Sequence, residues 1–353
     1  MADVKRIAEL MEARKPGEEI LRVEDLVVHY KIRAGWVRAV EGAKFSLNRG
    51  DTMGLVGESG CGKTTTGYSI AQLLPDNAYI KGGKIHFLGE EILSKTLLPD
   101  GRVDKFNEYM RKLRWKRISY IFQGAMNALN PVLKVGDQIV EAILAHEKVD
   151  EETARERVKE LYKLVGIPPD RIDNYPHEYS GGMKQRAMIA MALALNPDLI
   201  IADEPTTALD VIVQDKILGE MTRLQRELGM TMIIITHDIS IVAEIANKMS
   251  VMYAGQIVER GTTRHIFKRF AHPYTKGLLG SFPSIVGEKR RLEAIPGSPP
   301  NLLNPPSGCR FHPRCPYAQE ICRTEEPPEV EVEPGHFVKC HFAEKFFKEW
   351  HGG

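Results

Sequence analysis

Residues 51–74 read DTMGLVGESGCGKTTTGYSIAQLL, and this stretch decides the fold of the chain. Its first seven residues are typical of a buried strand, and its last twelve have the apolar spacing of a helix. The junction of strand and helix, residues 57–65, reads GESGCGKTT and contains the pattern G-x-x-x-x-G-K-[ST]. Glycines in such a loop let backbone N–H groups point at phosphate oxygens, and the following helix adds the positive end of its dipole. The stretch therefore predicts a phosphate-binding loop, or P-loop, between a strand and a helix.

Different residues of this loop are expected to contact different parts of a nucleotide. Lys63 is expected to bind the β and γ phosphates, and Thr64 to ligate Mg²⁺. The alternative is an ordinary glycine turn, which the flanking strand and helix disfavour. We interpret Cys61 as a small residue without a redox role. The loop residues expected to bind ATP are Gly57, Glu58, Ser59, Gly60, Cys61, Gly62, Lys63, Thr64 and Thr65.

A pair of acidic residues ends a second apolar stretch. Residues 199–205 read LIIADEP, which predicts a buried strand that ends in Asp203 and Glu204. Asp203 is suited to position Mg²⁺ through its water shell, and Glu204 to polarise an attacking water. Such a pair is also found as a simple helix cap. Its occurrence in a chain with a P-loop favours the chemical role.

The rest of the chain follows an α/β pattern with a distinct end. RISYIFQ and TMIIITHD predict further strands of a largely parallel sheet, separated by segments long enough for helical crossovers. Helical periodicity dominates between residues 134 and 195, which indicates a helical subdomain. After about residue 261 the chain is rich in Pro and Cys and is expected to be dominated by loops. The predicted domains are an N-terminal extension (1–19), a nucleotide-binding domain (20–262) and a C-terminal extension (263–353).

Composition excludes several classes of protein. The 48 Lys plus Arg nearly cancel the 47 Asp plus Glu, so no global basic field is present to hold nucleic acid or an anionic membrane. The apolar runs are far shorter than the roughly 18–20 residues of a membrane-spanning helix, and the first twenty residues lack the apolar core of a secretory signal. The basic run 111–117, RKLRWKR, is interpreted as a solvated helix face. We expect a soluble, cytoplasmic chain.

A second phosphate-binding helix start is predicted in YSGGMKQR, residues 179–186. Ser180, Gly181 and Gly182 open a helix with free backbone N–H groups. One chain seldom needs two sites for the γ-phosphate. The hypothesis is that this second site closes over a nucleotide held by a partner subunit, so that ATP joins two domains.

Together these motifs resemble the ATPase family of ABC transporters over roughly residues 20–261. The resemblance implies a RecA-like P-loop NTPase core with antiparallel β and α-helical subdomains. Gln123 in YIFQG matches the family's Q-loop, which senses the γ-phosphate and Mg²⁺ and touches the permease. The signature LSGGQ of the family has Tyr179 and Met183 at its ends in this chain.

Three further residues gain roles from the resemblance. His237 in IIITHD matches the switch histidine, and the resemblance implies a catalytic role for it together with Glu204. Asp210, at the end of TTALD, matches the loop that communicates across the dimer, and Tyr30 in VVHYKI matches the aromatic residue that stacks on adenine. The implied Mg²⁺ ligands are Thr64, Gln123 and Asp203.

A closer resemblance is to the ATPases of dipeptide and oligopeptide importers. It rests on IFQGAMNALNPVLKVGDQI (121–139), YSGGMKQRAMIAMAL (179–193), HPYTKGLLGSFP (272–283) and GCRFHPRCPYA (308–318). This family imports peptides and, in some members, oligosaccharides or nickel. It implies an ATPase at the cytoplasmic face of the membrane, with a second and usually different ATPase subunit, two permeases and an extracytoplasmic solute-binding protein as partners.

Two other functions compete with this one. A soluble ABC-type ATPase acting on ribosomes or DNA repair complexes usually fuses two ATPase halves or carries a long coiled coil, and the sequence predicts neither. A regulatory module without turnover is disfavoured because Lys63, Asp203, Glu204 and His237 are all present. No nucleic acid partner is expected.

Four of the five cysteines lie in the last fifty residues with the spacing C-x5-C-x6-C-x17-C. Four thiolates suit either a structural Zn²⁺ or a [4Fe-4S] cluster, and disulfides or free thiols are the alternative. The paired C-x2-C pattern typical of zinc is absent, and the importer resemblance implies an iron–sulfur cluster. The expected role is to staple a small module that lacks a core of its own. The residues concerned are Cys309, Cys315, Cys322 and Cys340.

Overall fold

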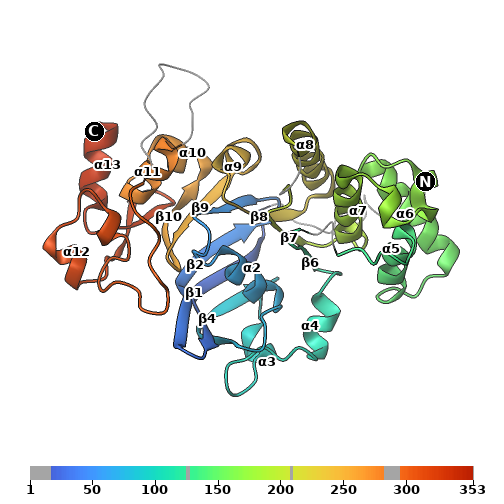
Figure 1. Ribbon diagram of the computed structural model, residues 1–353, viewed down its shortest axis with the longest axis horizontal. Helices are drawn as coiled ribbons and strands as arrows, with labels where there is room; N and C mark the ends of the chain where they lie inside the picture. Colours follow the sequence, from blue (N-terminus) through green and yellow to red (C-terminus); the bar gives the residue numbers. More distant parts are fainter. Residues whose placement is uncertain (1–16, 125–127, 207–209, 282–294, 353) are drawn as a thin grey trace. The chain divides into compact units, whose positions relative to one another are not determined.

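The computed structural model describes residues 17–124, 128–206, 210–281 and 295–352 (Figure 1). They form two compact units, each assembled from separate stretches of the chain. We call the first the helical unit (Met1–Ile20, Asn48–Thr52 and Phe106–Ile234) and the second the P-loop unit (Leu21–Leu47, Met53–Lys105 and Ile235–Gly353). The domain boundaries given above stay a prediction.

The helical unit combines a few parallel strands with most of the long helices. Strand β6 (Ile118–Ile121) pairs in parallel with β7 (Leu199–Asp203), which neighbours β8 (Thr231–Thr236). All residues of β7 and β8 are buried, as expected of parallel strands covered on both faces. The helices are α4 (Glu108–Leu113), α5 (Val135–Leu144), α6 (Glu151–Leu164), α7 (Gly181–Leu193) and α8 (Val211–Leu228), with 3₁₀ turns at Pro169–Asp173 and Pro176–Glu178.

The basic run at residues 111–117 departs from the expected continuous helix face. Helix α4 ends at Leu113, and Trp115 has a left-handed φ of 66°. The Trp115 indole Nε1 donates to the Met191 carbonyl at 2.8 Å. The chain leaves the helix because it must turn into β6, where the Arg117 carbonyl accepts from the N–H of Asp198 at the start of the neighbouring strand.

The P-loop unit contains two groups of strands. The first is a four-stranded sheet, in which β1 pairs antiparallel with β4 from Leu21 opposite Phe87 to Tyr30 opposite Ala78. Its order is β2 (Gly35–Asn48), β1 (Glu19–Ile32), β4 (Ala78–Phe87) and β5 (Glu90–Glu91). The second group has the order β11 (Glu329–Glu333), β12 (His336–Lys339), β10 (Gln256–Thr262), β9 (Lys248–Tyr253) and β3 (Thr52–Val56).

Short helices connect these strands. Helix α2 (Lys63–Ala71) follows the P-loop, α3 (Leu93–Thr96) follows β5, and α9 (Ile239–Ile245) precedes β9. The C-terminal extension adds α10 (Thr263–Lys268), α11 (Pro273–Gly280), the 3₁₀ turn His312–Arg314, α12 (Glu320–Thr324) and α13 (Ala343–His351).

The extension is more regular than its Pro-rich sequence indicates. Its strands β11 and β12 join the sheet at β10, with Val338 opposite Glu259. The Glu259 carboxylate is buried and accepts from the N–H groups of Ala271 (2.7 Å) and His272 (3.2 Å), and it lies 2.8 Å from His336 Nε2. The segment keeps many loops, as expected, but it also contains short strands, because these obtain hydrogen-bond partners from the sheet they join.

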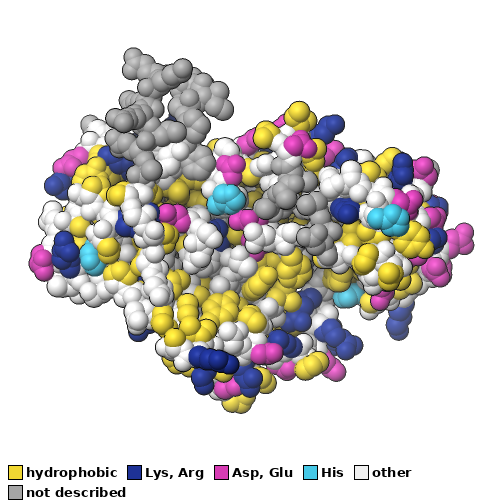
Figure 2. Space-filling view, in the orientation of Figure 1, with side chains coloured by type: hydrophobic (Ala, Val, Ile, Leu, Met, Phe, Trp, Pro, Cys, Tyr) yellow, Lys and Arg dark blue, Asp and Glu magenta, His cyan; other side chains and the backbone are white. Residues whose placement is uncertain are grey.

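One face of the molecule carries charged side chains of both signs (Figure 2). On the face seen in Figure 2, acidic and basic side chains are interspersed with hydrophobic ones, in line with the formal net charge of +1. Across the ranges that the structure describes, no helix has both the length and the apolar character needed to cross a membrane.

Candidate functional site

The P-loop joins β3 to α2 and its shape requires glycine at two positions. Gly57 has a φ of 151°, and a Cβ there would lie 2.0 Å from the Met252 carbonyl oxygen. Gly62 has a φ of 107°, and its Cβ would lie 2.2 Å from the Ala39 carbonyl oxygen. Gly62 is also the N-cap of α2 and offers no side-chain acceptor, so the first N–H groups of this helix point into the loop for an incoming anion.

Lys63 is held inside the loop by backbone oxygens. Its Nζ donates to the carbonyls of Gly57 (2.8 Å) and Glu58 (3.0 Å), and the residue is 6 % exposed. These carbonyl oxygens are neutral acceptors. When a nucleotide binds, its phosphate oxygens would take their place and form charge-assisted hydrogen bonds with the Lys63 ammonium group. Burial raises the pKa of the Cys61 thiol, which keeps it in the unreactive protonated form.

Two other predicted residues of the P-loop unit lie at strand ends. The Tyr30 hydroxyl, near the end of β1, is 3.0 Å from Thr65 Oγ1 in α2, so this aromatic side chain is tied to the P-loop. His237 directly follows β8 and is exposed. The next residue, Asp238, is the N-cap of α9 and accepts from the Ser240 N–H at 2.8 Å.

In the helical unit, the strand register brings two predicted residues together. Ile121 on β6 lies opposite Ala202 on β7, so the same register continued by two residues sets Gln123 opposite Glu204. The Gln123 Nε2 donates to Glu204 Oε2 at 2.8 Å. Glu204 has a φ of 46°, an uncommon conformation for a residue other than glycine and one often found at functional sites.

Asp203 is buried at the end of β7, and its partner was not predicted. Its Oδ2 accepts from the Tyr120 hydroxyl at 3.0 Å, and Asp203 is 1 % exposed. The sequence does place Tyr120 in the YIFQG motif, but alternation along a strand does not show that the hydroxyl reaches the acid. Tyr120 thus orients the carboxylate expected to position Mg²⁺.

The predicted signature lies at the start of α7. Ser180 is the N-cap, and its Oγ accepts from the Met183 N–H at 3.3 Å. A Cβ at Gly182 would lie 2.8 Å from Val213 Cγ1, so α7 and the start of α8 are in close contact. Tyr179, where the family has Leu, is buried and its hydroxyl donates to the Arg171 carbonyl at 2.7 Å.

Asp210 and its neighbours form an exposed edge beside this helix start. Asp210 is the N-cap of α8 and accepts from the Val213 N–H at 3.0 Å. Val211 and Ile212 follow with 80 % and 78 % exposure, which is high for β-branched apolar side chains. Residues 125–127 and 207–209, which belong to the predicted Q-loop segment and to TTALD, lie outside the described residues.

The four cysteines of the extension line one small, apolar cavity together with Phe311 and Phe346. All are free thiols, so the disulfide alternative is not realised. Burial raises the pKa of Cys315 to about 11 and that of Cys340 to about 12. A metal group held here would have to supply the positive charge that turns these buried thiols into thiolates.

The spacing of the thiols bears on which metal group fits. Among the described residues, His265, Glu333 and His336 place ligand atoms within 4.8 Å of one another, and the four thiols do not form such a set. A Zn²⁺ ion with bonds of about 2.3 Å would hold its sulfurs about 3.8 Å apart. A [4Fe-4S] cluster binds each thiolate at a different iron and spaces them more widely. Four free thiols that line one cavity are donors of the kind that either group uses.

Comparison with known proteins defines the class first. Residues 40–207 match the ABC transporter family. The structure resembles the dimeric ABC transporter cassette MJ0796 with a TM-score of 0.60 at 26 % identity, covering 69 % of this chain and 99 % of that one. It also resembles cbiO1 of Clostridium perfringens, part of the ABC transporter complex cbiONQ, with a TM-score of 0.57 at 28 % identity, covering 71 % of this chain and 91 % of that one. This chain is an ABC ATPase, and the predicted α/β P-loop fold is confirmed.

The family within this class follows from the full length of the chain. Residues 258–322 match the C-terminal region of oligopeptide/dipeptide transporters. The oligopeptide transport ATP-binding protein OppD of Bacillus subtilis is 47 % identical over 91 % of this chain and 88 % of its own length. OppD of Escherichia coli is 44 % identical over 93 % of this chain and 94 % of its own length. The dipeptide transport ATP-binding protein DppD of B. subtilis is 44 % identical over 92 % of this chain and 94 % of its own length. The chain belongs to the family of oligopeptide and dipeptide transport ATP-binding proteins.

Proposed function

We propose that this chain is the ATP-hydrolysing subunit of an importer that takes up dipeptides or oligopeptides through separate permease subunits. The observation that carries this proposal is the match of residues 258–322 to the C-terminal region of oligopeptide/dipeptide transporters, in a chain that also carries the ATPase motifs. ATP with Mg²⁺ is the cofactor. The chain acts at the cytoplasmic face of the membrane, bound to its permeases.

The proposed roles of the site residues come from the family resemblance, and contacts within each unit support some of them. The P-loop holds the phosphates through backbone N–H groups and Lys63, and Tyr30 stacks on the adenine. The Mg²⁺ is bound by Thr64, Gln123 and Asp203. Glu204 orients the attacking water. The contact of Gln123 Nε2 with Glu204 Oε2 supports this, because one residue that senses the γ-phosphate is already bonded to the proposed base. His237 completes the catalytic set.

Exposed apolar residues support the proposal that the chain contacts a second ATPase subunit and a permease. Val211 and Ile212 stand beside the start of α7, where a second ATPase subunit would dock to place its nucleotide against Ser180. Val132 and Leu133, in the segment after Gln123, are 75 % and 43 % exposed and suit a permease contact. Isolated exposed apolar residues are common, but a group next to a functional motif marks an interaction surface.

Uptake and co-purification test the proposed function. A strain that lacks this chain is expected to lose import of a labelled tripeptide, and the wild-type gene to restore it, while import of a labelled amino acid is unchanged. The tagged chain is expected to bring down two hydrophobic permeases from detergent extracts. Recovery of ribosomal or DNA-bound proteins instead, with peptide import intact in the deletion strain, would contradict the importer and favour a soluble ABC-type ATPase.

For the extension we propose that Cys309, Cys315, Cys322 and Cys340 hold a [4Fe-4S] cluster. Such a group would tie four segments of this small module together through metal–thiolate bonds. Support comes from the shared cavity and from N–H groups aimed at sulfur, such as that of Phe342 at 3.5 Å from Cys340 Sγ. Zn²⁺ is the alternative occupant.

Metal analysis of anaerobically purified protein distinguishes a [4Fe-4S] cluster from a Zn²⁺ ion. We expect about four iron and four sulfide per chain with a brown colour, and loss of both in Cys315→Ser. Cys61→Ser is the matched control and should keep its iron, because Cys61 lies in the P-loop and not in this cavity. One zinc per chain, or no metal at all, would refute the cluster.

A further inference from the structure

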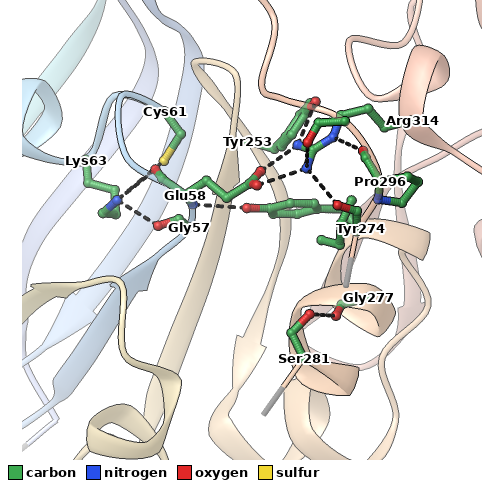
Figure 3. A network of polar contacts seen from close by, with 12 residues as sticks. Gly57, Glu58, Cys61, Lys63, Tyr253, Tyr274, Gly277, Ser281, Pro296 and Arg314 are labelled. Carbon is green, nitrogen blue, oxygen red and sulfur yellow. Dashed lines mark hydrogen bonds and ion pairs between the residues drawn. The ribbon is translucent and has the colours of Figure 1, made fainter. Parts of the chain in front are cut away.

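Glu58 is the one acidic side chain within the P-loop motif, residues 57–65. Its carboxylate points toward the C-terminal extension, on the side away from Lys63 (Figure 3). There it forms a bidentate ion pair with Arg314, with Nη1 to Oε2 at 2.7 Å and Nη2 to Oε1 at 3.0 Å. A residue 256 positions further along the chain therefore contacts the loop expected to hold ATP.

Arg314 is fixed in place by a full set of acceptors. Its Nε donates to the Pro296 carbonyl at 2.7 Å, and Nη2 also reaches the Ile295 and Gly297 carbonyls at 3.4 and 3.3 Å. The Arg314 side chain is 5 % exposed, and the hydrogen bond to Glu58 raises the pKa of the guanidinium. The guanidinium is therefore held by acceptors of the extension as well as by Glu58.

Aromatic residues hold the same side of the loop. The backbone N–H of Glu58 donates to the Tyr274 hydroxyl at 3.0 Å. Tyr274 packs against Tyr253 with ring centroids 4.6 Å apart, and both rings are 1 % exposed or less. The Tyr253 hydroxyl lies 3.4 Å from Arg314 Nη1. The extension thus contacts both the backbone and the side chain of the second residue of the loop.

The negative charge of Glu58 would repel the phosphates of a bound nucleotide, and the ion pair with Arg314 reduces this repulsion. A triphosphate in the loop carries several negative charges, and an unpaired carboxylate one residue from the first loop glycine would repel it. The repulsion would be strong because Glu58 is only 27 % exposed and water screens it poorly. A bidentate guanidinium contact removes most of that field.

We propose that Arg314 is a positioning residue of the ATP site: it neutralises Glu58 and holds the first turn of the P-loop, so that the C-terminal extension is required for full nucleotide affinity. Arg314 does not touch the nucleotide and acts only through Glu58. The proposal rests on ATP binding by this loop and does not depend on which solute the transporter carries.

Equilibrium binding of a fluorescent ATP analogue to the full-length chain tests the proposal. Arg314→Ala is expected to weaken binding on the order of tenfold, because it leaves a partly buried carboxylate unpaired beside the phosphates. The double variant Arg314→Ala with Glu58→Gln removes both charges and is expected to recover most of the lost affinity. A purely structural role of Arg314 would not be rescued by a second substitution that removes its partner.

A matched control is available where the extension joins strand β10. Arg260 on β10 forms a bidentate pair with Glu329 on β11, at 3.1 and 3.0 Å, and among the described residues no hydrogen bond or ion pair joins its side chain to the P-loop. Arg260→Ala is expected to leave the affinity unchanged, which separates loss of the charge on Glu58 from general loosening of the extension. Wild-type affinity in Arg314→Ala would overturn the proposal, and so would a double variant as weak as the single one. Failure of the wild-type chain to bind ATP would instead refute the proposed function.

Discussion

Glu204→Gln is expected to reduce ATP turnover by the assembled transporter on the order of 10³-fold while leaving ATP binding intact. Gln has the shape of Glu and keeps an oxygen that accepts from Gln123 Nε2, which lies 2.8 Å from the carboxylate in the native chain. It lacks the negative charge needed to polarise water. ATP would then stay bound at the subunit boundary, and the ATPase pair would remain closed.

Two measurements check this expectation. Steady-state phosphate release gives the turnover, and size-exclusion chromatography with MgATP detects the trapped dimer. Glu220→Gln on α8 is a suitable control, because it changes a partly exposed Glu that pairs with Arg223 on the same helix. If the Glu204 variant turned over ATP at the normal rate, Glu204 would not be the base.

Ser180→Asp is expected to reduce turnover on the order of 100-fold by acting on the partner's nucleotide. Asp is as good an N-cap as Ser, so α7 should begin at the same residue and the fold should be kept. The new carboxylate would stand at the helix start, where the partner's γ-phosphate is expected. Charge repulsion there opposes closure of the pair.

Ser180→Asn separates charge from shape, since Asn also caps the helix but is neutral. We expect it to retain much more of the turnover than Ser180→Asp. Binding of ATP to the isolated chain should be the same in both variants and in the wild type, because that binding uses the chain's own P-loop. If Ser180→Asp weakened binding to the isolated chain, the signature would act on the chain's own nucleotide and the hypothesis of sites shared between subunits would fail.

Local patterns predicted the elements of this fold well, and failed where a contact depended on distant segments. Residues 51–74 form β3, the loop and α2, as expected from strand and helix periodicity around a glycine turn. EVEVE at 329–333 alternates as a strand should, but Pro residues on both sides indicated a loop. It became β11 because β12 provides a partner, and an edge strand tolerates flanking Pro and charged residues.

In the candidate site, too, the sequence predicted individual residues, and the structure was needed to show their contacts. The sequence named Gln123 and Glu204 separately, and their contact came from the parallel register of β6 and β7. Tyr120, which donates to Asp203, was missed because no spacing rule reports a side-chain contact between two strands.

The sequence by itself determined the class of protein, since a P-loop and a signature are short patterns in which backbone conformation depends on glycine and on helix caps close by. Only the tertiary structure decided that Arg314 forms an ion pair with Glu58 and that the Tyr274 hydroxyl accepts a hydrogen bond from the backbone of the same residue. Ion pairs between residues far apart in the chain leave no local periodicity. They form where the folded backbone brings an acid and a base together, out of water, at hydrogen-bond distance.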